Sequence, residues 1–282
     1  MDAGQPSRMA HGVALLRAAH QLLDRPRVFD DPLAVGIMGH ATERALRANP
    51  QLYRSDAPIR AFVVVRSRFA EDLLAQAVAS GVRQYVILGA GLDTFAYRNP
   101  HAAAGLRVFE VDHPTTQAWK RARLAETGTR IPDWLSFAPV DLARDALARS
   151  LNGAGFRADK PALLSLLGVV IFMPQRTVME ILNFVASLPE GSGVAFDYGM
   201  LDSSLDAHQR AVRESGARQA AALGEPYLTF LDPPVLAAEL RQMGFSQIDD
   251  CGPDAINRRY FEDRNDGLRV GPGGRRIVGA RR

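Results

Sequence analysis

The chain has 282 residues, of which 47% are hydrophobic and 23% charged, and a formal net charge of +3. This composition excludes fibrous and intrinsically disordered proteins, and it suffices for one α/β domain with a substantial core, although the length also permits two domains. No apolar run reaches the roughly 18 residues of a membrane span, and the small positive charge is no indication of nucleic-acid binding.

The first sixty residues are helical in character and contain no expected strand. Apolar spacing predicts a helix over residues 13–23, which Pro26 terminates because proline disfavours helix in the residue before it. Asp31-Pro32 predicts the start of a short helix that continues through Met38. We interpret residues 1–60 as a helical cap and residues 61–282 as the ligand-binding domain, the two forming one structural unit.

A long amphipathic helix is predicted over residues 59–79, closed by Gly81. Strands and helices then alternate, as in a mainly parallel sheet. Strands are expected at residues 84–88, 106–111, 135–140, 162–169, 193–198 and 245–250, with a last one before Arg281. Helices are expected at residues 115–126, 143–154, 175–187, 204–223 and 234–243.

The apolar runs at residues 85–88 and 162–170 are nearly continuous, which is typical of parallel strands buried on both faces. The last two strands, connected through Gly271-Pro272-Gly273-Gly274, are expected to form an antiparallel hairpin. The sequence therefore predicts a Rossmann-like α/β fold with a mainly parallel sheet.

The most informative segment is the first expected strand, which breaks into Gly89-Ala90-Gly91 and is followed by a second strand that ends in Asp112. Open α/β sheets bind ligands beyond the carboxyl ends of their strands, where glycine allows close approach of the backbone. Asp112 stands about 20 residues after the second glycine, the interval at which a carboxylate reaches ribose hydroxyls. A Gly-x-Gly pair alone is often a plain turn, but the flanking strand and the spaced acid favour a nucleoside site at Gly89, Ala90, Gly91 and Asp112.

The third glycine of a dinucleotide-binding turn is absent, because Thr94 stands in its place. That glycine permits close helix packing beside a pyrophosphate. A nucleoside ligand without phosphate fits better, and S-adenosylmethionine is the commonest such ligand. An NAD-linked oxidoreductase is the disfavoured alternative.

Three motifs together resemble those of a known family: Gly89-Ala90-Gly91-Leu92-Asp93-Thr94, Glu110-Val111-Asp112-His113-Pro114 and Pro139-Val140-Asp141-Leu142. From about Leu15 to the C-terminus the chain resembles the class I methyltransferases related to leucine carboxyl methyltransferase. The likeness is strongest to the actinobacterial branch of candidate S-adenosylmethionine-dependent methyltransferases. It implies a seven-stranded methyltransferase sheet with S-adenosyl-L-methionine, the methyl donor, bound at the strand ends.

The resemblance also implies roles for three further residues. Asp141 would accept from the adenine amino group and Leu142 would present its backbone amide to the ring, which complements the donor and adjacent acceptor of adenine. Asp141 is also a residue type that caps a following helix. Arg66 would pair with the methionine carboxylate through its planar fork, although an arginine on an amphipathic helix is more often solvated.

The chain departs from the family at Leu167, where leucine carboxyl methyltransferases carry a glutamate after the fourth strand. The missing acid argues against the phosphatase-tail substrate of the eukaryotic enzymes. It also keeps open a non-catalytic role, in which the chain binds the donor or acts as a scaffold without turnover.

We expect an O-methyltransferase that acts on a carboxylate or hydroxyl of a small molecule. A carboxylate is ionised at neutral pH and needs no base, whereas a phenol or alcohol does. His113 is the candidate base, although a packing role in its turn fits it better, and His20 is a more distant candidate; no catalytic residue or metal ligand is assigned. Tyr198, Phe172 and Met173 are either acceptor contacts or core residues.

Cys251 is the single cysteine, so no internal disulfide can form, and a small packed residue explains it better than a catalytic thiol. The N-terminus lacks the apolar stretch of a signal peptide. We therefore expect a cytoplasmic protein whose partner is a small-molecule acceptor, with no nucleic acid and no membrane. The sequence carries no signal for an oligomeric state.

Overall fold

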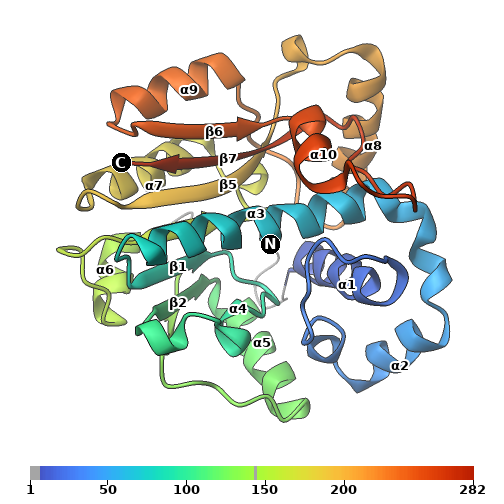
Figure 1. Cartoon of the computed structure of the whole chain (residues 1–282), viewed down its shortest axis with the longest axis horizontal. Helices are drawn as coiled ribbons and strands as arrows, with labels where there is room; N and C mark the ends of the chain where they lie inside the picture. The colour runs from blue at the N-terminus through green and yellow to red at the C-terminus, as the bar shows by residue number, and fades with distance from the viewer. Residues whose placement is uncertain (1–6, 143–144) are drawn as a thin grey trace.

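The computed structural model, which describes residues 7–142 and 145–282, contains a seven-stranded sheet with helices on both faces (Figure 1). The strand order is β3-β2-β1-β4-β5-β7-β6. The strands are β1 Gln84–Leu88, β2 Arg107–Asp112, β3 Leu135–Pro139, β4 Leu163–Leu166, β5 Gly193–Gly199, β6 Gln247–Cys251 and β7 Arg275–Arg281. Neighbours from β3 to β5 run parallel, and β7 is antiparallel to both β5 and β6. The predicted mainly parallel sheet with an antiparallel C-terminal pair is confirmed.

From residue 7 to the first strand the structure has three α-helices and two short 3-10 helices: α1 Arg8–Leu23, η1 Gly36–Met38, α2 His40–Ala48, η2 Pro50–Asp56 and α3 Ala57–Ala79. The later helices include α4 Phe95–Arg98, α5 Pro114–Glu126, α6 Leu147–Gly153, α7 Gln175–Ser187, α8 Ala207–Ala222, α9 Pro233–Gln242 and α10 Pro253–Phe261. Short 3-10 turns lie at η3 Ala102–Ala104, η4 Val170–Phe172 and η5 Asp202–Ser204.

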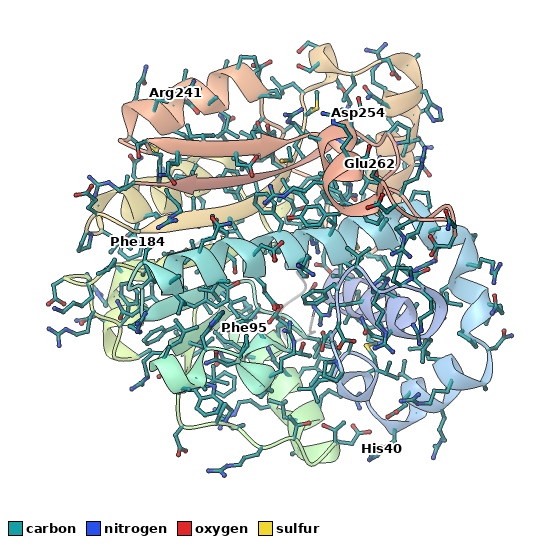
Figure 2. All side chains as sticks on the ribbon, in the orientation of Figure 1. His40, Phe95, Phe184, Arg241, Asp254 and Glu262 are labelled. Carbon is teal, nitrogen blue, oxygen red and sulfur yellow. The ribbon has the colours of Figure 1, made fainter. Side chains whose placement is uncertain are left out.

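Helix α3 crosses one face of the sheet (Figure 1). Its second half packs through Leu74 and Val78 on side chains of β1 and β2, and its first half contacts α10 and β7. Helices α6, α7 and α9 cover the opposite face. Figure 2 shows Phe95 of α4 in the interior, whereas the exposed Arg241 and Asp254 point away from it. Strands β1 and β4 are consequently buried along their whole length.

Helix α3 has the predicted extent to within two residues, but only its second half is amphipathic in its setting. Buried side chains lie all round its first half, at residues 60–67, including the charged Arg60 and Arg66, because the sheet, α1 and α10 pack on different sides. Gly81 ends the helix as expected, with φ of 98°. The amides of Gly81 and Val82 donate to carbonyls of the last turn over 3.0 Å each, which satisfies groups that the helix leaves open.

Several predicted boundaries are wrong. Strand β4 stops at Leu166 instead of residue 169, because Gly168 has φ of 74° and η4 then turns the chain. The helix expected through Met38 is reduced to η1. Residues 143–144 of the helix expected at 143–154 lie outside the described residues, and α6 begins at Leu147. Helix α8 begins at Ala207, three residues late.

The connection between β6 and β7 is not a simple hairpin, since it contains the unpredicted helix α10. Ile256 and Phe261 are the buried residues of α10, and they pack in the same cluster as Phe62 and Val65 of α3. This helix is short and mostly polar, so its stability comes from tertiary packing. Within the described ranges, every helix is too short or too polar to cross a lipid bilayer.

Candidate functional site

A cavity of about 520 Å³ opens at the carboxyl ends of β1 to β4. The chain order reverses between β1 and β4, and ligands of open α/β sheets bind at such a switch point. The cavity is lined by all seven residues predicted to bind the donor: Arg66, Gly89, Ala90, Gly91, Asp112, Asp141 and Leu142. Side chains and backbone from α3 and from three strand ends therefore meet in one space.

The glycine turn at residues 89–91 has left-handed backbone at both glycines, with φ of 65° at Gly89 and 48° at Gly91. The amides of Gly89 and Ala90 donate to Val111 O over 2.8 and 3.1 Å, which anchors the turn to β2. A Cβ on Gly89 would overlap the side chain of Val169. Glycine is therefore required here both by the backbone conformation and by the loop that follows β4.

Asp112 is half-buried at the end of β2, with its carboxylate held by two backbone donors. Gly91 N donates to Oδ2 over 2.5 Å, and His113 N donates to Oδ1 over 2.7 Å. Burial raises the pKa of Asp112 above its ordinary value, although these two donors act to lower it. Each carboxylate oxygen can accept more than one hydrogen bond, so the group retains capacity for ligand hydroxyls.

Asp141 and Leu142 follow β3, beside Asp112. Val140 N donates to Asp112 O over 2.8 Å, which joins the two strand ends. Asp141 N donates to Asp145 Oδ2 over 2.9 Å. Asp141 is not the N-cap of α6, since that position is Ala146. The capping alternative for Asp141 concerns the amides of residues 143 and 144, which lie outside the described residues, and Asp141 itself lines the cavity.

Arg66 is 3% exposed and forms an ion pair across the sheet face, with Nη1 3.2 Å from Asp197 Oδ2. Gly168 N donates to the other oxygen of Asp197 over 2.5 Å. A Cβ on Gly168 would come within 2.6 Å of Arg66 Nη2, so the guanidinium packs directly on this glycine. Burial lowers the pKa of Arg66, an effect that Asp197 opposes. The alternative from the helical pattern, that Arg66 is a solvated surface residue, is wrong because the side chain is buried.

Arg17, Asp31 and Thr94 form a buried polar cluster behind the glycine turn that the sequence did not predict. Arg17 of α1 lines the cavity, with Nε 3.2 Å from Asp31 Oδ2, and its Nη2 donates to Leu92 O. Asp31 also accepts from Thr94 Oγ1 over 2.7 Å. An arginine within an otherwise apolar helical stretch was the available signal for Arg17.

The first turn of α1 and residues 224–226 and 228 also line the cavity. Glu225 joins them: Oε1 accepts from the amides of Arg8 and Met9 over 2.8 and 3.1 Å, and Oε2 accepts from Ser7 Oγ over 2.7 Å. A carboxylate beside a helix N-terminus is favoured by the exposed amides and the helix dipole. The cap is therefore tied to the far side of the cavity.

The two candidate bases have different settings. His113 lines the cavity and caps α5, with Thr115 N donating to its Nδ1 over 3.3 Å. His20 is not among the lining residues; its Nε2 accepts from Val28 N over 3.2 Å, so its Nδ1 carries the proton that is shared with Asp24 over 2.7 Å.

Phe172 and Met173 line the main cavity, and Tyr198 lines a small neighbouring chamber while its hydroxyl donates to Asp250 over 2.7 Å. Among the described residues, no cluster of three or more His, Cys, Asp or Glu side chains could hold a metal ion. Cys251 is buried, and burial raises the pKa of its thiol to about 11, which suits a packed residue rather than a nucleophile.

Comparison with known sequences gives a consistent result. Residues 10–186 match the family model described as leucine carboxyl methyltransferase. A candidate S-adenosyl-L-methionine-dependent methyltransferase of Bacillus subtilis is 30% identical over 285 residues, which cover 90% of this chain and 91% of that protein. One of Mycobacterium tuberculosis is 32% identical over 239 residues, covering 79% and 76% of the two chains.

The solved structures include a candidate methyltransferase from Thermobifida fusca that superposes with a TM-score of 0.58. It is 18% identical, and the match covers 100% of this chain and 96% of that one. At this level of identity the likeness establishes a shared fold, in agreement with the strand order described above.

Proposed function

The chain belongs to the leucine carboxyl methyltransferase family, and from this premise we propose that it is an S-adenosyl-L-methionine-dependent O-methyltransferase of a small molecule, with a carboxylate as the favoured acceptor. The donor is the one for which its curated relatives are named. In this proposal the donor is bound by the seven residues predicted for it, which are Arg66, Gly89, Ala90, Gly91, Asp112, Asp141 and Leu142.

The observation that carries the proposal is the shared cavity. Asp112 and Asp141 stand at neighbouring strand ends joined through Val140, so one nucleoside can meet a carboxylate at its ribose and another at its base. Arg66 lies at a different part of the wall, on α3, where a planar guanidinium suits the methionine carboxylate. The volume of about 520 Å³ is within the range of small-molecule sites.

Methyl transfer is an in-line displacement at a sulfonium, so the protein chiefly aligns the acceptor with the methyl group and excludes water. An ionised carboxylate attacks without loss of a proton. This fits a cavity in which His113 already serves as a helix cap. Leu167 also lines the cavity, so it puts no negative charge beside an ionised acceptor at the position where the resemblance implies a glutamate.

The proposal is tested with the full-length protein and S-adenosylmethionine labelled in the methyl group, incubated with a panel of carboxylic acids and phenols. We expect label in a base-labile ester product. A product that resists base would indicate phenol or amine chemistry, and binding of the donor without transfer to any acceptor would favour a non-catalytic role. A thermal shift with S-adenosylhomocysteine but not with NADH excludes the oxidoreductase alternative.

A further inference from the structure

A small chamber adjoins the main cavity beside Arg66. It has a volume of about 30 Å³, and it shares five lining residues with the main cavity: Met9, Val13, Arg66, Gly168 and Phe172. Its other walls come from Ile171, from the end of β5, from Tyr227 and from Arg275 at the start of β7. Neither Asp112 nor Asp141 contributes to it. The chamber thus extends the donor site past Arg66 and away from the nucleoside residues, with room for one small polar group.

The chamber carries an excess of positive charge. Arg66 is balanced by Asp197, with 3.2 Å between Nη1 and Oδ2. Arg275 forms no ion pair with an acidic side chain in the part of the chain that the structure describes; its Nη2 donates to Tyr227 Oη over 3.1 Å. The next residue on the strand, Arg276, is by contrast paired with Asp250 at 2.9 Å on the other face of the sheet.

Aromatic rings flank this charge. Phe172 and Tyr227 meet edge to face with ring centroids 5.5 Å apart, and Phe172 borders both spaces. Tyr227 is half-buried, and Phe230 supports its ring at 6.4 Å. Because Tyr227 Oη accepts from Arg275, its own proton is available to an oxygen placed in the chamber.

We propose that Arg275 and Tyr227 hold the carboxylate of the methyl acceptor in the chamber, while Phe172, which borders both spaces, contacts an aromatic or other flat apolar body that lies in the main cavity. The acceptor class is therefore an aryl-substituted carboxylic acid. One carboxylate oxygen is held by Arg275. The other oxygen forms the new bond to the methyl carbon as the carbon–sulfur bond breaks. The electron pair of the broken bond stays on the sulfur, and the products are neutral S-adenosylhomocysteine and a methyl ester.

This inference rests on the proposed function, so the experiment measures donor and acceptor binding separately. Calorimetry with S-adenosylhomocysteine comes first, on the full-length parent and on Arg275→Gln. We expect affinities within about twofold of each other, since Arg275 lines the chamber and not the main cavity. If the parent fails to bind S-adenosylhomocysteine, the proposed function itself is wrong.

The second step titrates phenylacetate and its neutral analogue phenylacetamide into the protein saturated with S-adenosylhomocysteine. We expect the parent to prefer phenylacetate at least tenfold, Arg275→Gln to lose that preference, and Tyr227→Phe to lose part of it. Arg276→Gln is the matched control from the same strand and should keep the full preference.

Hexanoate tests the aromatic part of the proposal and should bind more weakly than phenylacetate. Equal binding of phenylacetate by the parent and Arg275→Gln overturns the role of Arg275. The role of Arg275 is also overturned if the parent binds S-adenosylhomocysteine but then binds phenylacetate, benzoate and 3-phenylpropionate each no more tightly than the corresponding amide.

Discussion

Thr94 Oγ1 donates a 2.7 Å hydrogen bond to Asp31 Oδ2, and this bond joins the glycine turn to the segment that follows α1. Thr94 is 1% exposed and Asp31 is fully buried. Asp31 also faces the guanidinium groups of Arg17 and Arg98, at 3.2 and 3.5 Å. The residue that breaks the dinucleotide pattern therefore anchors a buried carboxylate, which a glycine could not do.

Thr94→Val should destabilise the protein by about 1 to 3 kcal/mol, because it leaves one oxygen of the buried Asp31 without its hydroxyl donor. Urea denaturation measures the loss. Thr94→Ser is the matched control, since it keeps the hydroxyl and removes only a methyl group, and it should retain most of the stability. Equal losses for valine and serine would show that packing and not the hydrogen bond is what Thr94 supplies.

Asp141→Asn should remove the preference of the site for adenine. A carboxylate accepts from the adenine amino group, whereas the carbonyl of hypoxanthine at the same position would repel it. We expect the parent to bind S-adenosylhomocysteine about 10- to 100-fold more tightly than S-inosylhomocysteine, as befits one charged hydrogen bond. Calorimetry with both ligands should show that the asparagine variant loses this ratio.

Asp112→Ala tests the predicted contact between Asp112 and the ribose, with the same two ligands. The two ligands share the same ribose, so this variant should weaken both by a similar factor of about 10 or more and leave their ratio intact. If Asp112→Ala binds either ligand as tightly as the parent does, Asp112 does not contact the ribose. If Asp141→Asn still prefers S-adenosylhomocysteine to S-inosylhomocysteine, Asp141 does not contact the base.

The elements that could be predicted from sequence are those with strong local signals. Residues 84–88 and 175–187 match β1 and α7 at both ends, because a buried apolar run ends in a glycine turn in one and a periodic helix follows Pro174 in the other. The glycine turn and Asp112 were found for the same reason, since both follow the ends of apolar strands.

The missed parts depend on contacts between distant residues. Ser7 and Glu225 are 218 residues apart, and Arg66 and Asp197 are 131 apart, so no spacing in the sequence connects them. Helix α10 is short and mostly polar, and it is held by packing on α3. Arg66 itself was placed through the family resemblance, whereas its partner Asp197 requires the register of β5 against α3.

Glu225→Gln should loosen the first turn of α1. The neutral amide can accept from one or two of the three donors but loses its charge beside the helix N-terminus. Since hydrogen bonds to a charged group contribute about 1.5 to 3 kcal/mol, we expect amide exchange at Met9 and Ala10 to become about tenfold faster.

Met9 and Ala10 line the cavity, so S-adenosylhomocysteine should also dissociate faster from Glu225→Gln. Glu214→Gln, on the exposed side of α8, should change neither quantity. Exchange rates in α1 that match those of the parent would mean that packing alone holds the cap in place.

Asp24 connects α1 to α3 through a buried network that makes stability depend on pH. Arg60 Nε donates to Asp24 Oδ2 over 2.8 Å, Arg60 Nη2 donates to Oδ1 over 3.0 Å, and His20 contacts Oδ2 over 2.7 Å. Burial acts to raise the pKa of Asp24, but the hydrogen bonds from His20 and Arg60 outweigh it and lower the pKa to about 2. The ionised form is therefore stabilised by folding.

Because the pKa in the folded state lies below the unfolded value of 3.8, the contribution of Asp24 is complete well above pH 4 and is lost as the pH falls toward 2. When the pH is lowered from 6 to 3, protonation linked to Asp24 should lower the unfolding free energy of the parent by about 1 kcal/mol. Asp24→Asn should be less stable than the parent at pH 6, since it leaves the buried Arg60 without a counter-charge. At pH 3 the difference in unfolding free energy between the two proteins should be smaller by about 1 kcal/mol. Urea denaturation at the two pH values measures this, with Asp30→Asn in an exposed ion pair as the control. A deficit that stays constant with pH would mean that Asp24 acts through shape and not through its charge.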